Sequence, residues 1–439
     1  MRGSRRKSRT GLGILALVTL LGVAACTHRS SAGAGATAVT PSSTAAVGEG
    51  ATGPGATPSN GASAHLPPAQ LGLQLEQLLG RHALLATRLM RSVVAVPGLR
   101  PAAEASLRDN TASLSQAVAA AYGGAEGARF QQLWQRRGDD LVAYASGVAD
   151  GSASATQRAR SALAADASAY GTWLATASKG RVQAAAVASD ARAGVESLLR
   201  QVDAYAAHDY AHAYQSERAA FEQFWAAGTP LAKGSLAPKA AATLDAAPTK
   251  LRAAFAMLLG EHMELVVDAQ RATFAGAAEF RAAASQLNAN SAALARGLGA
   301  IVGPKKGAEF QADWADHVSG LMAYAAAVAG KDEAGETAAE QRLQRFTVTL
   351  ATYFASVVHN PKAFVPLTAA ITAHDTHLMD QVNAYATHNY TVSQQVEGHG
   401  YQQMLGVAGT LVDAIQQMEA ANLPKGGSQT GGGGTARRP

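Results

Sequence analysis

The sequence predicts an all-α protein made of two tandem up-and-down helical bundles of about six helices each, with a disordered N-terminal linker and C-terminal tail. Three observations predict this fold. The central part is rich in Ala and Leu, and its few prolines separate long stretches of helical periodicity. No sustained alternation of apolar and polar residues indicates a strand. The same pattern of residues occurs twice, 180 positions apart, as an internal repeat.

The first 25 residues have the composition of an export signal. A basic head (2–9) precedes an apolar run (11–25) that is shorter than the roughly 20 apolar residues of a membrane-spanning helix. The run ends in VAAC, which is typical of a bacterial lipoprotein signal cleaved before a lipid-modified Cys26. We therefore expect the protein to be anchored to the lipid membrane through Cys26, on the extracytoplasmic face of the cell membrane. An ordinary signal peptide (1–25) with an incidental cysteine is the alternative.

The positive charge of the chain comes from this signal. The formal net charge is +5, from 37 Lys and Arg against 32 Asp and Glu, but five of the basic residues precede Cys26. The remainder is neutral, so we expect no nucleic-acid partner. Cys26 is the single cysteine of the sequence, which excludes disulfides and thiolate metal sites.

Composition also divides the rest of the chain. Residues 26–66 are mainly Ser, Thr, Ala, Gly and Pro and predict a flexible tether, and residues 424–439 predict a disordered tail. The stretch between them is long enough for two domains. We expect helical bundle repeat A at 67–229, a Pro-punctuated linker at 230–248 and helical bundle repeat B at 249–423.

Matching residues define the repeat. Blocks such as QVDAYAAHDY and QVNAYATHNY align over long spans without gaps, as do the pairs Leu107 and Leu287, Phe130 and Phe310, Trp134 and Trp314, and Tyr144 and Tyr324. Between these blocks we expect the register to slip, so that Tyr170 corresponds to Tyr353. Gly, Pro, Asn and Asp clusters end each periodic stretch. In the second copy they predict helices at 249–277, 279–302, 307–330, 334–358, 363–388 and 390–422.

Three helices of the second copy each carry a histidine in an apolar stripe. His262, His317 and His374 replace a large apolar residue in rows spaced by three and four, which predicts that all three are buried. Short connections make neighbouring helices antiparallel. Reflecting positions through the expected turns then places the three histidines in one cross-section, with Met404 beside them.

The first copy has a different set at these positions, namely His82, Arg137, Gly194 and Phe224. We therefore place the candidate site in the second copy. His82 is interpreted as a hydrogen-bonded core histidine, and Arg137 is expected to pair with a carboxylate such as Glu217.

A layer of buried imidazoles needs a partner for each ring nitrogen, and a metal ion supplies one. His262, His317 and His374 with the Met404 thioether suit copper, whereas a water or carboxylate in place of the thioether suits zinc or iron. The alternative is a metal-free polar layer in which the histidines bond to Tyr324, Tyr353 or Asn290.

Further polar residues lie near the layer. Glu397 and His377 are weaker candidate ligands, because Glu397 is expected several residues above the layer as a structural buried carboxylate and His377 is expected to face solvent. Three acidic residues beside the histidines in the sequence either orient ligands or are charges on the helix surface, namely Glu264, Asp313 and Asp375.

The segments LLGEH, LNAN, NAYATHNY and the Phe-x-x-x-Trp-x-x-His run at 310–317 resemble a family of secreted bacterial helical-repeat proteins, some of which are labelled copper amine oxidase. The resemblance covers both repeats. Such an oxidase would imply a β-rich catalytic domain and a Thr-x-x-Asn-Tyr-Asp/Glu motif. The nearest segment, Asn389-Tyr390, has Ala386 at the Thr position and Thr391 after the tyrosine. We therefore do not infer oxidase activity from this resemblance.

The sequence thus predicts a lipid-anchored extracytoplasmic protein whose second bundle binds a transition metal for storage, sensing or delivery. The alternative is a metal-free envelope protein whose helical surfaces bind another envelope protein. An enzyme is the third alternative, since a site of three histidines can be catalytic, but no acid–base or nucleophile arrangement accompanies the histidines in the sequence.

Overall fold

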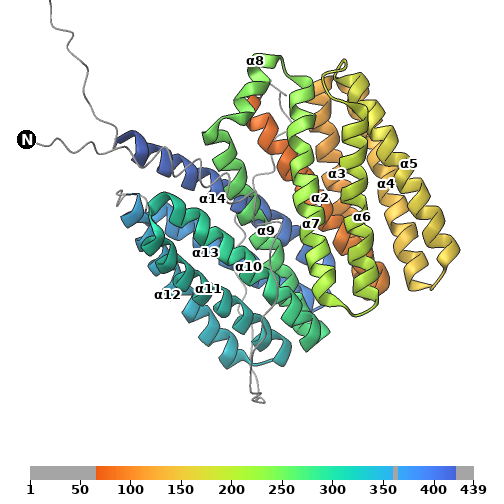
Figure 1. Ribbon diagram of the computed structural model, residues 1–439. Helices are drawn as coiled ribbons and strands as arrows, with labels where there is room; N and C mark the ends of the chain where they lie inside the picture. Colours follow the sequence, from red (N-terminus) through yellow and green to blue (C-terminus); the bar gives the residue numbers. More distant parts are fainter. Residues whose placement is uncertain (1–65, 359–363, 422–439) are drawn as a thin grey trace, which may run out of the picture.

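The computed structural model describes residues 66–358 and 364–421, and this part of the chain is all-helical, without a strand (Figure 1). The predicted signal peptide, Cys26, nearly all of the predicted tether and the predicted tail lie outside the described residues. Among the helices that are described, none is long and apolar enough to cross a membrane.

The long helices form two sets that repeat each other along the chain. The first set is α2 (Pro68–Val94), α3 (Arg100–Tyr122), α4 (Gly124–Ala149), α5 (Ala153–Ala177), α6 (Ala184–Ala206) and α7 (Tyr210–Ser235). The second set is α9 (Ala247–Ala275), α10 (Ala277–Val302), α11 (Pro304–Gly330), α12 (Glu333–Val357), α13 (Phe364–Ala386) and α14 (Tyr390–Ala421). The short α8 (Pro238–Ala241) lies between them. The helices predicted for the second copy agree with these bounds to within three residues.

The repeated segments HDY and HNY form the same turn. His208 and His388 have φ angles of 59° and 60°, the left-handed conformation that commonly ends a helix. The side chain of Asp209 accepts a hydrogen bond from the backbone N–H of His212, and Asn389 caps α14 in the same way. This motif is therefore a helix boundary, which accounts for its presence in both halves.

Pro230 does not end α7, although we predicted from the sequence that the linker begins at this residue. The helix continues to Ser235 because it is held directly against α2. A Cβ atom on Gly228 would lie 2.5 Å from the Cα of Glu76, so the two backbones touch at this glycine. The hydroxyl of Tyr122 donates to the carbonyl of Leu231 on the far side of the proline.

The repeat distance stays at 180 through α5 and α12, so the predicted slip was wrong. The two helices begin and end 180 positions apart. Tyr353 corresponds to Trp173 and not to Tyr170. Trp173 donates its indole N–H to Glu126, and Tyr353 donates its hydroxyl to the carbonyl of Lys306, the residue equivalent to Glu126. Tyr170 and Tyr353 lie at nearby but non-equivalent positions of the two helices, and pairing them suggested a shift of register that does not exist.

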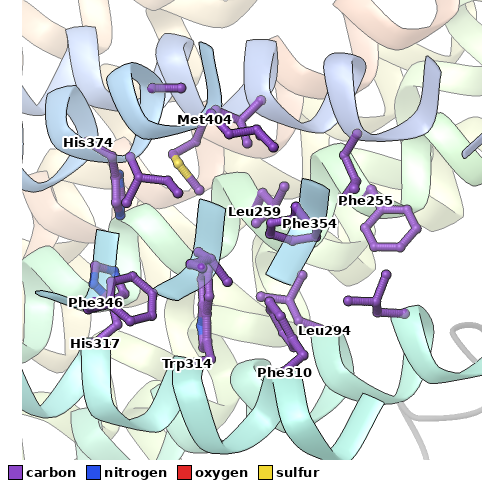
Figure 2. Close-up of a pocket in the computed structure, with 17 residues that line it drawn as sticks. Phe255, Leu259, Leu294, Phe310, Trp314, His317, Phe346, Phe354, His374 and Met404 are labelled. Atoms are coloured by element: carbon purple, nitrogen blue, oxygen red, sulfur yellow. The ribbon is translucent and has the colours of Figure 1, made fainter. Parts of the chain in front are cut away.

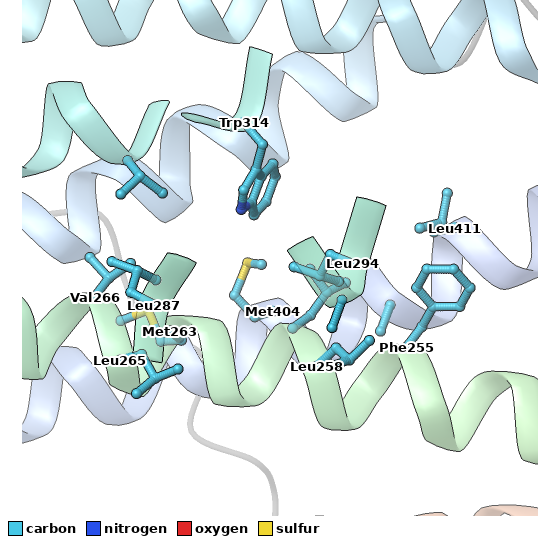
Figure 3. Packing of buried hydrophobic residues seen from close by; sticks show 14 of the residues in the cluster. Phe255, Leu258, Met263, Leu265, Val266, Leu287, Leu294, Trp314, Met404 and Leu411 are labelled. Carbon is cyan, nitrogen blue, oxygen red and sulfur yellow. The ribbon is translucent and has the colours of Figure 1, made fainter. Parts of the chain in front are cut away.

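The two sets pack against each other along α2 with α9, α7 with α10 and α3 with α14 (Figure 1). The core of the second set accordingly takes in Leu84, Phe221 and Trp225 from the first. Figure 3 shows the centre of this core, where the side chains of Met404 and Trp314 face each other between the helices. The three predicted histidines lie on α9, α11 and α13, at the same level of this core.

Candidate metal centre

Three helices of the second set bring three histidines together. His262, His317 and His374 are at most 3% exposed. One ligand atom from each lies within 4.8 Å of the other two, and the ring centroids are 5.6 to 6.0 Å apart. The clustering predicted from the apolar stripes is therefore present, and the cluster could hold a metal ion.

The spacing is close to that of a metal site. Three atoms at the corners of a triangle with sides of at most 4.8 Å lie at most about 2.8 Å from its centre. Imidazole nitrogens bind zinc at about 2.0 to 2.1 Å. A movement of at most about 0.7 Å by each ring would bring the three nitrogens to that distance.

None of the six ring nitrogens in this cluster has a hydrogen-bond partner among the described residues. The predicted bonds to tyrosine or asparagine are absent, although Oδ1 of Asn290 is itself without a partner among the described residues. Tyr324 bonds to Asn383, Tyr353 to the carbonyl of Lys306, and Asn290 to the carbonyl of Leu258 and the carboxylate of Glu261. Burying a polar group without a partner is costly, so the cluster lacks a partner that a cation would supply.

The first set shows how such a histidine is normally satisfied. His82 Nδ1 lies 3.2 Å from Asn110 Oδ1, so the predicted hydrogen bond exists for one of its two nitrogens. Asn290, the residue equivalent to Asn110, donates from Nδ2 to the carbonyl of Leu258 and to Glu261, but its Oδ1 forms no hydrogen bond to His262.

Burial keeps the three histidines neutral. It lowers the pKa of His262 and His317 well below the usual range, with a further decrease from the neighbouring imidazoles. Burial, reinforced by nearby His377, lowers the pKa of His374 to about 3. Neutral imidazole is the form that binds a metal, so the site is competent at physiological pH.

A buried carboxylate lies behind one of the rings. His317 Nδ1 is 3.5 Å from Asp375 Oδ1, and Thr347 donates to the other carboxylate oxygen at 3.4 Å. Burial raises the pKa of Asp375 well above its usual range, although the bond from Thr347 opposes this rise. A cation held by His317 would favour the carboxylate form. A carboxylate in this position fixes the orientation of a histidine ligand and increases its basicity.

Met404 on α14 lies beside the histidine cluster. It is 3% exposed and lines a cavity of about 50 Å³ together with His317 and His374. Figure 2 shows its thioether on the side of the cavity where the two histidines lie. The rest of the lining, which includes Trp314 and Phe346, is aromatic and aliphatic.

The two weaker candidates lie apart from the group of three. His377 is half-buried, with Nδ1 3.4 Å from Gln403 Oε1. Glu397 is fully buried and forms ion pairs with Arg88 of the first set and with Arg271. Its interpretation as a structural carboxylate agrees with these contacts.

Arg137 does not pair with Glu217, contrary to the prediction. Its guanidinium lies 4.1 Å from the ring centre of Trp134, and Asp166 is the acidic residue that acts on it. Glu217 instead accepts a hydrogen bond of 2.8 Å from Arg91. The difference arises because Glu217 faces the junction between the two sets, whereas Arg137 faces the core of the first.

Comparison with protein-family models, with curated proteins and with solved structures gives no match to this chain. The chemistry of the site therefore has to be inferred from its own residues.

Proposed function

We propose that this protein is a membrane-anchored extracytoplasmic lipoprotein of two tandem six-helix bundles (67–229 and 249–423), in which the second bundle binds a transition metal. His262, His317 and His374 are the proposed ligands, and Met404 is the fourth. One observation carries the proposal: three buried histidines face one another, and none of their ring nitrogens has a partner among the described residues.

The charge of the site favours copper(I) over zinc or iron(II). The three imidazoles are neutral, the Met404 thioether is neutral and the cavity lining is apolar. Asp375 can supply one negative charge through His317, which balances a monovalent ion. A divalent ion would leave a net charge in an apolar core, which is costly. A thioether ligand also selects the softer ion.

The surroundings suit holding an ion more than catalysing a reaction on a polar substrate. The described residues that line the cavity beyond the ligands are aromatic and aliphatic, and they provide no acid–base pair. Storage, sensing or delivery of the metal outside the cytoplasm is therefore the proposed role, with Cys26 as the attachment to the membrane.

The test is a titration of purified protein with copper(I), copper(II), zinc and iron(II), with metal content measured by mass spectrometry. We expect one tightly held ion per chain, with copper(I) bound most tightly. His317→Arg introduces the residue that the first half carries at position 137, and it should abolish binding. His82→Ala is the matched control in the first half and should leave binding unchanged.

The metal-free alternative predicts a different result. If no ion binds more tightly than about 1 μM, the histidine cluster is a feature of the core, and an envelope protein that binds the helical surfaces becomes the better proposal.

A further inference from the structure

The cavity beside the histidines extends beyond the space that the proposed metal ligands need. It runs from His317, His374 and Met404 to Phe255 and Phe354 at the other end (Figure 2). A metal ion bound by the histidines would occupy one end only. The remainder is an apolar space in the core of the second set, and the proposed metal site does not use it.

Two residues that line this space are smaller than their equivalents in the first set. Leu350 is equivalent to Tyr170, a buried aromatic ring of the first core, and Met404 is equivalent to Phe224. Other lining residues are larger, since His374 is equivalent to Gly194, on which the Phe224 ring packs, and Phe346 is equivalent to Asp166. Leu350→Tyr would therefore return one ring of the first set to the wall of this space.

The volume limits what can bind. An apolar cavity of roughly 150 Å³ in another protein stays dry and accepts benzene or xenon. The present cavity, at about 50 Å³, is a third of that size and suits a ligand of about two heavy atoms. Water is disfavoured in the apolar part, since a buried water needs two to four polar partners.

We propose that this cavity binds a neutral diatomic lone-pair donor of the class of carbon monoxide against the metal ion held by His262, His317 and His374. The inference rests on the proposed metal site. Carbon monoxide donates its carbon lone pair to copper(I), and no electron is transferred and no co-reactant is needed. It takes the fourth position in place of the Met404 thioether, whose flexible side chain can move aside. The apolar walls then hold the free end of the ligand.

The first measurement uses metal-free protein under xenon pressure and needs no metal site. Methyl resonances of Leu350, Ile371 and Met404 should shift in a saturable way, whereas Leu85 in the core of the first set should not. The absence of a saturable shift at these three residues would overturn the inference.

The second measurement is the infrared spectrum of copper(I)-loaded protein under carbon monoxide. We expect one narrow C–O stretching band. Leu350→Tyr restores the ring of the first set, and it should weaken carbon monoxide binding by about tenfold or more without changing copper(I) affinity. Val348→Tyr adds the same ring at a position on α12 that is 52% exposed, and it should change neither affinity. Ile371→Phe fills the cavity from another helix and serves where Leu350→Tyr does not fold.

The outcomes separate the two proposals. Copper(I)-loaded protein that binds no carbon monoxide, or binds it equally well after the cavity is filled, overturns the gas site and leaves the metal site standing. Protein that binds no copper(I) overturns both.

Discussion

His317 and Phe346 stack, with ring centroids 4.4 Å apart and an interplanar angle of 18°. Their equivalents in the first set are Arg137 and Asp166, which interact through their opposite charges. The two halves thus exchange a neutral stacked pair for a charged one at the same place in the core. Only the stacked pair leaves an imidazole whose nitrogens can bind a metal.

This exchange predicts the stability of two variants. His317→Arg should destabilise the protein by about 3 kcal/mol, because the cost of desolvating a guanidinium in this apolar core exceeds its attraction to nearby Asp375. Adding Phe346→Asp recreates the pair of the first half and should recover most of that loss, while metal binding stays absent in both variants. Urea denaturation measures the free energy of unfolding. A double variant that is no more stable than the single one would contradict this account.

Trp314 offers an optical signal for the site. Its ring lies 4.7 Å from that of His262 and 5.3 Å from that of His317, measured between centroids. The protein has four tryptophans, and Trp314 is the one in the second half. Copper bound by the histidines should therefore quench part of the tryptophan fluorescence. Trp314→Phe should remove this quenching and Trp134→Phe, its equivalent in the first half, should retain it. Quenching that survives in Trp314→Phe would place the metal elsewhere.

Much of the site was predictable because apolar periodicity and helix length act locally. The stripes around His262, His317 and His374 determine which helix face is buried, and helices of similar length joined by short turns bring those faces to one level. Met404 was found by the same reasoning. The repeat also indicated which half would carry the site, because a glycine cannot replace His374 as a ligand.

Other features depend on choices that periodicity does not determine. Side-chain rotamers determine that Asn110 Oδ1 bonds to His82, whereas Asn290 Oδ1 forms no bond to His262. The junction of the two sets depends on which helix faces meet. Buried Arg88 and Arg91 near the end of α2 were the available signal, since charged residues are rarely fully buried unless they are paired.

Asp375 predicts a difference between two neighbouring substitutions on α13. Asp375→Asn removes the carboxylate behind His317 and should lower metal affinity by about 10- to 100-fold. His377→Ala removes an imidazole that bonds to Gln403 outside the cluster, and it should leave both affinity and stoichiometry unchanged. Competition with a chelator of known affinity measures both. Equal losses in the two variants would show that His377 is a ligand, or that Asp375 does not act through His317.

The junction between the sets contains two equivalent ion pairs with different environments. Arg91 pairs with Glu217, and 180 positions later Arg271 pairs with Glu397. Burial raises the pKa of Glu217 to about 8, because desolvation and nearby Asp268 outweigh Arg91. Burial also opposes ionisation of Glu397, but contacts with both Arg88 and Arg271 lower its pKa to about 2.

These opposite shifts predict opposite dependences of stability on pH. Folded protein holds an extra proton on Glu217 between its usual pKa of 4.5 and about 8, so the contribution of this group is complete below pH 4.5 and is lost as the pH rises through 8. The contribution of Glu397 is present above pH 4.5 and is lost as the pH falls through about 2.

Glu217→Gln should therefore flatten the decrease in the free energy of unfolding between about pH 5 and pH 8. Glu397→Gln should cost about 3 kcal/mol at neutral pH, because it leaves Arg88 and Arg271 without their shared carboxylate. Urea denaturation of both variants across this pH range makes the comparison, and a larger loss for Glu217→Gln than for Glu397→Gln at pH 7 would show that the two carboxylates do not differ in this way.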